Sequence, residues 1–330
     1  MRCPTLEELP TPPPGREGWP WTRGCPPLPS RMPDGDVWPR LSIVTPSYQQ
    51  GDYIEETIRS VLLQGYPDIE YVIIDGGSSD GTVATIRKYE PWLAYWCSEP
   101  DRGQAHAINK GRAHLTGLFF QFINSDDVLA ENALEVVARH ARQHRAVAGT
   151  VATIGTSSPQ LVRNTTLSVE DLILGSRDFH QPGIWVNRED VENVGGFDEN
   201  FHFVFDKDFY IRFMRKNMFS IARVQEKLAF FRLHEESKTA KSHKHFIEEE
   251  FKMLGKYIDD EKFLHFRQTM EERREKIFWR AQKNAAREYH TNKLHRNIAL
   301  VMLALRRAVQ QRLSWRRRSN ERRRRPLVTL

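Results

Sequence analysis

FFQFINSDDVLAENAL, residues 119–134, places a strand, an acidic turn and a helix in direct succession. Apolar or aromatic side chains fill four of the five positions of Phe119–Ile123, which indicates a buried strand. Asn124-Ser125-Asp126-Asp127 ends it, and a helical segment follows from about Glu131. Adjacent carboxylates repel each other, so two interpretations compete: a solvated turn with an aspartate helix cap, and a metal-diphosphate site. The rest of the chain must decide between them.

Strands alternate with helices before this turn. The predicted strands are 41–45 (ended by Pro46), 71–74, 93–97 and 118–123. The helices between them include one capped by Asp52, with apolar residues at helical spacing up to Leu62, and helices at 82–89 and 105–115. This alternation predicts an α/β fold with a mostly parallel sheet and βαβ crossovers. Ligands collect at the carboxyl ends of the strands in such sheets. Thr45, Asp75, Glu99 and Asp126 each follow a strand, so we expect them along one edge.

The pattern changes after Asp127. Helices are expected at 132–144 and 206–214, and strands at 146–154, 184–186, 220–224 and 227–233. A long, charged, helical segment begins near residue 246. We therefore expect three parts: an irregular leader (1–40), an α/β domain (41–245) and a helical extension (246–330).

The leader holds eleven of the eighteen prolines, a density that prevents helices and interior strands. Burial of Trp19, Trp21 and Trp38 is expected to anchor it to the domain. A proline-rich ligand for a partner protein is the alternative.

The net charge of +6 belongs to the carboxyl-terminal tail. Residues 306–325 hold ten arginines and one acid, which leaves −3 for the rest of the chain. Apolar residues between Leu294 and Leu313 share one helical stripe, so residues 294–325 are typical of a basic amphipathic helix on an anionic membrane surface. A dimerising helix and a disordered tail are the alternatives. No nucleic-acid recognition fold accompanies the charge, so we expect no nucleic acid.

Three widely spaced cysteines, with no CxxC, argue against a disulfide framework and indicate a reducing compartment. The first forty residues contain no apolar signal core, and the longest apolar run near the tail is eight residues. The expected location is therefore cytoplasmic, with peripheral attachment to the plasma membrane through the tail.

Candidate site residues lie in loops, since no P-loop, GxGxxG or HExxH motif is present. Asp75 opens a glycine-rich loop and is positioned to accept from a ligand, whereas Asp80 is expected to cap a helix. Asn124, Asp126 and Asp127 offer oxygen ligands to a divalent ion. Asp206 and Asp208 begin a helix, where acids also serve as helix stabilisers. His180 and His234 are either ligands or surface histidines.

The chain resembles the family 2 glycosyltransferases of the GT-A fold, in particular those acting on bacterial cell-surface polysaccharides. The motifs that carry the resemblance span residues 41–240, and they are Thr45-Pro46-Ser47-Tyr48-Gln49-Gln50, Asp75-Gly76-Gly77-Ser78-Ser79-Asp80-Gly81-Thr82, Ser98-Glu99-Pro100-Asp101-Arg102-Gly103, Ala107-Ile108-Asn109-Lys110-Gly111, Asn124-Ser125-Asp126-Asp127, Gly195-Gly196-Phe197-Asp198, Asp206-Lys207-Asp208 and Arg232-Leu233-His234.

The resemblance implies a role for each candidate. The nucleotide contacts are Thr45, Pro46, Tyr48, Asp75, Asp101, Asn109, Lys110, Asn124 and Ser125. Asp126 and His234 would hold Mg²⁺ or Mn²⁺, and Asp206 would be the general base. Asp127, His180, Gln181 and Asp208 would support these groups or contact the acceptor. The chain departs from the family at Asn124, which opens the DxD-type motif, and at Phe205, where an acid usually precedes the base.

The expected activity is an inverting transfer of sugar from a nucleotide-diphosphate donor, with UDP as the default, to a saccharide or lipid-linked acceptor. A nucleotidyltransferase would usually show a basic loop after the first strand, and Thr45–Gly51 has no lysine or arginine. The alternative from another class is a catalytically inactive GT-A-like binding or scaffold protein.

Overall fold

The computed structural model describes residues 1–257 apart from 157–158, 165–167, 175–178, 218–219 and 235–242. Residues 1–257 form one compact unit. The predicted basic helix and most of the predicted extension lie outside the described residues. Among the described helices, none is both long and apolar enough to span a bilayer.

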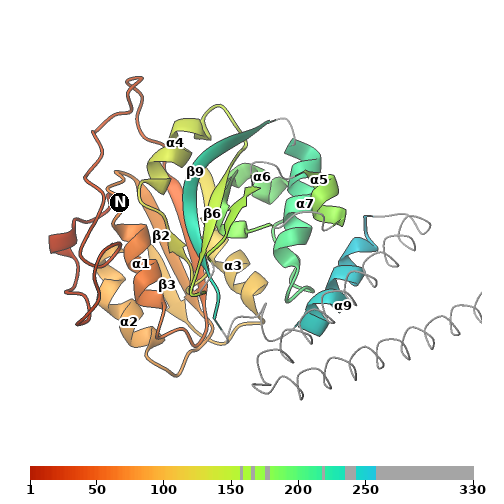
Figure 1. The fold of residues 1–330 in the computed structure, drawn as a ribbon, viewed down its shortest axis with the longest axis horizontal. Helices are drawn as coiled ribbons and strands as arrows, with labels where there is room; N and C mark the ends of the chain where they lie inside the picture. Colours follow the sequence, from red (N-terminus) through yellow and green to blue (C-terminus); the bar gives the residue numbers. More distant parts are fainter. Residues whose placement is uncertain (157–158, 165–167, 175–178, 218–219, 235–242, 258–330) are drawn as a thin grey trace, which may run out of the picture. The chain divides into compact units, whose positions relative to one another are not determined.

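A mixed sheet forms the centre of the unit (Figure 1). Its amino-terminal half is parallel, as predicted, and consists of β1 (Leu41–Ser47), β2 (Ile69–Asp75), β3 (Tyr95–Ser98) and β4 (Phe119–Phe122). The strand order is β3-β2-β1-β4-β8-β6-β9-β5, with β7 paired to β6. Four strands therefore end side by side at the edge where ligands are expected.

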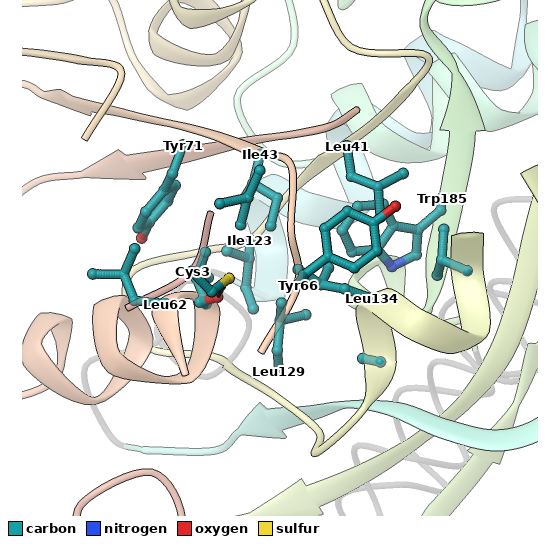
Figure 2. Close-up of a cluster of buried hydrophobic side chains, with 14 of the residues drawn as sticks. Cys3, Leu41, Ile43, Leu62, Tyr66, Tyr71, Ile123, Leu129, Leu134 and Trp185 are labelled. Atoms are coloured by element: carbon teal, nitrogen blue, oxygen red, sulfur yellow. Dashed lines mark hydrogen bonds between the residues drawn. The ribbon is translucent and has the colours of Figure 1, made fainter. Parts of the chain in front are cut away.

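Side chains alternate between the two faces of this sheet. One face, with Leu41, Ile43 and Tyr71, packs against α1 (Ile54–Leu62), α2 (Thr82–Tyr89) and α4 (Ala133–Ala141) in a large buried core (Figure 2). The other face packs against α3 (Gln104–Arg112), where Gly111 lies so close to Val44 that a Cβ there would clash. The site is thus built on a sheet held from both sides.

The second half of the sheet adds β5 (Val128–Leu129), β6 (Ala146–Ile154), β7 (Leu161–Arg163), β8 (Ile184–Asn187) and β9 (Ile221–Arg232). The other α-helices that the structure describes are α5 (Val169–Leu174), α6 (Arg188–Asn193), α7 (Phe205–Asn217) and α9 (His243–Leu254). The prediction of two strands at 220–233 was wrong, because β9 is continuous. Its register against β6 jumps from Ala148–Arg223 to Thr150–Lys227, as at a β-bulge. Gly149 lacks the Cβ that would meet the Leu228 side chain there.

Pro46 does not end the first strand, contrary to prediction. Backbone groups of β1 point alternately to β2 and β4, and the carbonyl of Val44 accepts from the N–H of Ile123 at the end of β4. Pro46 points to the same side one step further, where β4 no longer offers a partner. Its missing N–H therefore removes no ladder hydrogen bond.

The leader is fastened to α1 by a fully buried arginine, Arg59. Its guanidinium donates to the carbonyls of Pro10 (2.8 Å), Pro20 (3.1 Å) and Trp21 (2.9 Å). A further bond reaches the Tyr89 hydroxyl at 3.1 Å. Trp21 and Trp38 are buried, and the Trp19 indole N–H donates to the Leu129 carbonyl. The irregular leader therefore contributes both polar and apolar contacts to the domain.

Replacing Arg59 with methionine tests this anchor. Arg59→Met keeps most of the buried side-chain volume but leaves the three leader carbonyls without their donor, so we expect the free energy of unfolding to fall by ~3 kcal/mol or more. Urea denaturation measures it. Arg139→Met, which removes an exposed ion pair with Glu135, is the control and should cost under ~1 kcal/mol. Equal effects would contradict the anchoring role.

Candidate active site

The Asp75 carboxylate organises the loop after β2. It is fully buried and accepts from the N–H groups of Gly77 (3.2 Å) and Ser78 (2.9 Å). The hydroxyls of Ser78 and Ser98 each donate to it at 2.6 Å. Ser98 is the last residue of β3, so Asp75 joins the ends of two neighbouring strands.

The loop after β1 is tied to the glycine-rich loop. The N–H of Gln49 donates to the Ser78 hydroxyl at 2.8 Å, and that of Gly51 donates to Asp80 at 2.9 Å. Asp80 also accepts from the N–H of Thr82, the first residue of α2, although Gly81 and not Asp80 occupies the capping position of that helix. Tyr48, just before these hydrogen bonds in the loop, is 61% exposed and open to a ligand, whereas Thr45 is buried and bonds the Tyr71 hydroxyl. Pro46 is buried beside it.

Asp101 is close to the Asp75 loop. A Cβ on Gly76 would lie 2.8 Å from an Asp101 carboxylate oxygen, so a larger residue there would push the Asp101 side chain aside. The other oxygen of Asp101 accepts from the N–H of Gly103 at 2.7 Å. Lys110 forms an ion pair with Glu99 on the same loop. The structure therefore brings Asp75, Asp101 and Lys110 to the ends of β2 and β3.

Asn109, by contrast, connects α3 to the segment before α7. Its side-chain amide donates to the Phe197 carbonyl and to Glu199, and its oxygen accepts from the N–H of Phe197. These bonds occupy its polar atoms within the protein.

The acidic turn after β4 separates its two aspartates. An Asp126 carboxylate oxygen lies 2.9 Å from Nε2 of His234, so the two predicted metal ligands meet although they are 108 residues apart. Nδ1 of His234 is buried without a partner, and its ring lies against Tyr53. Asp126 retains partial exposure, with 20% of its side chain accessible.

Asp127 points inward and is fully buried. It accepts from the N–H of Arg232 at 2.9 Å and from the Asn124 amide at 3.2 Å. Burial, and then the charge of Asp126 beside it, raise the pKa of the Asp127 carboxyl well above its usual range. Asp127 thus joins the turn to β9 through the hydrogen bonds of its buried carboxylate.

Arg232 is a residue that the sequence patterns did not assign. Its Nε donates to the Asp126 carbonyl at 2.9 Å, and its guanidinium pairs with Glu56 at 3.0 Å. The same group lies over the Tyr53 ring, 5.4 Å from its centroid. Its place in the Arg232-Leu233-His234 motif was the only sequence signal.

Asn124 accepts from the Gln104 amide at 2.6 Å, which links the turn to the first residue of α3. Ser125 is buried within the turn. The turn therefore receives hydrogen bonds from a neutral donor, Gln104, as well as from Arg232.

Gln181, one of the residues predicted to contact the acceptor or support the site, lies at the end of β4. The Gln181 amide donates to the Phe122 carbonyl at 2.6 Å, while its own oxygen is buried without a partner. Phe205, the first residue of α7, packs on the Phe122 ring with centroids 5.9 Å apart. Asp206 follows it in the first turn and accepts from the Lys207 N–H. His180 stacks on Phe231 of β9.

Asp208 is turned away from this cluster. It is buried and bonds to Arg212 at 2.9 Å and to the Tyr257 hydroxyl at 2.7 Å. Asp208 therefore holds α7 in place, and its side chain does not point toward a ligand.

The donor set fits a hard divalent cation held partly by substrate. Within the described ranges, no cluster of three or more histidine, cysteine or acidic side chains is arranged to hold a metal. Asp126 and His234 would supply two ligands, and Mg²⁺ commonly takes one or two protein ligands with phosphates and water completing its shell.

Residues 42–220 match the family Glycosyl transferase family 2. The chain belongs to this family. An uncharacterized glycosyltransferase of Mycobacterium tuberculosis is 32% identical over 182 residues, covering 53% of this chain and 68% of the relative. TuaG of Bacillus subtilis, named for teichuronic acid biosynthesis, is 38% identical over 102 residues, covering 29% of this chain and 40% of the relative. The predicted family and transferase class are confirmed.

Solved structures support the fold. Staphylococcus aureus TarS 1–349 in complex with UDP has a TM-score of 0.52 and 17% identity, covering 69% of each chain. The mannosyltransferase PcManGT of Pyrobaculum calidifontis, in complex with GDP-Man and Mn²⁺, has a TM-score of 0.52 and 20% identity, covering 83% of this chain and 81% of that one. The predicted GT-A fold is thereby confirmed.

Metal titration tests the Asp126–His234 pair. Asp126→Asn and His234→Ala each remove one of two ligands, so we expect Mn²⁺ affinity in the presence of UDP to fall at least ~10-fold. Isothermal titration calorimetry measures it. His114→Ala, whose ring stacks on Tyr95 at the start of β3, is the control and should bind normally. Unchanged affinity in both site variants would remove these residues from the metal site.

Proposed function

We propose that this glycosyltransferase moves a sugar from a nucleoside-diphosphate donor to an acceptor hydroxyl with inversion at the anomeric carbon. One observation carries the proposal: Asp126, which follows β4 and contacts His234, lies after the same strand end on which Phe205 packs in the first turn of α7, next to Asp206. A metal-diphosphate site and a base are what a direct displacement requires.

The donor nucleotide would lie along the ends of β1, β2 and β3. Exposed Tyr48 offers a ring, Asp101 and Lys110 offer a carboxylate and a charge, and Asp75 shapes the loop between them. Thr45, Pro46, Asn124 and Ser125 would support these loops, and Asn109 would act through its bonds to 197–199. UDP is the proposed nucleotide, in line with the complex described for TarS.

Asp126 and His234 would hold Mg²⁺ or Mn²⁺, which when bound offsets the charge of the departing diphosphate. Asp127 would keep Asp126 in place through the turn, and burial together with the charge of Asp126 raises the pKa of the Asp127 carboxyl. The protein's own task here is to present one carboxylate and one imidazole at a fixed separation.

Asp206 would accept the proton of the acceptor hydroxyl as that oxygen attacks the sugar from the face opposite the diphosphate. A single displacement from that side inverts the anomeric centre. Gln181, with its unpartnered buried oxygen, and His180 would orient the acceptor, while Asp208 supports α7. The acceptor would be a saccharide or lipid-linked saccharide of the bacterial cell surface, in line with the name of TuaG.

A catalytically inactive binding protein is the competing function. An inactive protein has no need to keep a metal pair and a carboxylate at one strand end, so the geometry favours the enzyme.

Donor screening followed by Asp206→Asn tests the proposal. A thermal-shift screen of nucleotide sugars with Mn²⁺ identifies the donor, and release of the nucleotide then reports turnover. We expect Asp206→Asn to lower kcat by ~100-fold or more, because the base is lost while the donor still binds. Asp68 lies just before β2, at the opposite end of that strand from the candidate site, so Asp68→Asn is the control and should keep normal turnover. Near-normal turnover in folded Asp206→Asn would refute the assignment.

We also propose peripheral attachment at the cytoplasmic face of the plasma membrane through residues 294–325. Ten arginines in 306–325 supply the charge that anionic lipid attracts. We expect the whole chain to sediment with phosphatidylglycerol vesicles and not with neutral vesicles, and a chain ending at residue 293 to stay in the supernatant. Equal sedimentation of both chains would contradict this role.

A further inference from the structure

Helix α9 and residues 255–257 lie beyond the family match, which ends at residue 220. They contact the segment 198–208, which carries Asp206, at several points (Figure 1). Met253 and Leu254 are fully buried, so α9 is packed into the compact unit and not merely attached by surface charges.

Glu249 of α9 holds the backbone just before α7. Its carboxylate accepts from the N–H of His202, 2.9 Å from each oxygen, and from the N–H of Phe203 at 2.7 Å. These groups lie at the amino-terminal end of α7, where a negative charge is favoured by the helix dipole. Glu249 thus sets the path by which the chain enters that helix.

Glu250 holds the residue next to Asp206. It forms an ion pair with Lys207, and the two side chains are 10% and 11% exposed. A buried pair of this kind is costly to break from one side, because the remaining charge is left unpaired. The Lys207 N–H in turn donates to Asp206 at 2.7 Å, so the pair fixes the backbone that orients Asp206.

The residues after α9 hold both flanks of this segment. The Tyr257 hydroxyl donates to Asp208 at 2.7 Å. Lys256 pairs with Asp198 at 2.7 Å and lies 4.2 Å from the centroid of the Phe201 ring. Residues on both sides of Asp206 are therefore held by one short stretch, 249–257.

We infer that α9 and Tyr257 are a positioning element for the catalytic base, with Glu249 and Glu250 as its positioning residues. The inference rests on the proposed role of Asp206. Asp206 must lie within hydrogen-bond reach of the acceptor hydroxyl, and a displacement of 1 Å can cost ~100-fold in rate. Turnover then depends on a segment that the family match does not include, while donor binding at the other strand ends does not.

Hydrogen–deuterium exchange tests the contact without any substrate. In Glu249→Ala and Glu250→Ala, we expect amides of peptides covering 200–210 to exchange at least ~10-fold faster, and those covering 75–82 to be unchanged. Glu135→Ala, which removes the α4 ion pair to Arg139, is the matched control and should leave 200–210 unchanged. Unchanged exchange in both α9 variants would overturn the inference.

Steady-state kinetics with the donor found in the screen tests the consequence. We expect Glu250→Ala to lower kcat ~10- to 100-fold while KM for the donor and Kd for UDP with Mn²⁺ stay within ~2-fold. Glu250→Asp, which keeps the charge, should recover part of kcat. If Glu250→Ala fails to bind UDP, Tyr257→Phe replaces it in this test, because it loses only one hydrogen bond. We expect Tyr257→Phe to lower kcat ~3-fold or more without changing KM for the donor.

The outcomes separate this inference from the proposed function. If Asp206→Asn is inactive but the α9 and Tyr257 variants keep wild-type kcat, the base stands and its positioning by α9 is overturned. If Asp206→Asn stays active, the proposed base fails, and α9 loses this role whatever the exchange data show. Loss of donor affinity in step with kcat in Tyr257→Phe would likewise overturn it, because α9 and Tyr257 would then act on the whole domain.

Discussion

Two adjacent carboxylates at the end of a buried strand need donors close by, and much of the structure serves that need. Strand β9 ends beside the acidic turn and supplies the N–H and guanidinium of Arg232 and the imidazole of His234. Asp127 takes the buried position with a raised pKa, so that Asp126 alone faces outward. The continuity of β9 through its bulge matters here, because a break would separate the sheet from the residues that stabilise the turn.

Segments at both ends of the described chain brace this central sheet. The leader is held on α1 by a buried arginine that pairs with carbonyls instead of an acid. On the other side, α9 holds the chain where it enters α7. Both contacts join regions more than thirty-five residues apart in sequence. The family domain is therefore contacted by two segments, the leader and α9, that lie outside the family match.

Local patterns predicted what depends on local physics. Periodicity located β6 and α2 at their observed bounds, and the alternation of strands and helices predicted the parallel half of the sheet. Long-range contacts were not predictable in this way. Whether Pro46 ends a strand depends on where β4 stops, and the bulge in β9 depends on a glycine in another strand. The partners of Arg232 and Glu250, which are far from them in sequence, could not be predicted from local patterns.

Because Arg59 of α1 donates to carbonyls of the leader, α1 and the leader depend on each other, although the leader lies outside the family match. Arg59 donates to three carbonyls of the leader, so this core cannot simply be joined to the amino-terminal segment of a relative that lacks such a leader. Such a chimera would leave the guanidinium buried with too few acceptors. Recombination between relatives, natural or in the laboratory, would therefore have to transfer α1 together with the proline-rich leader.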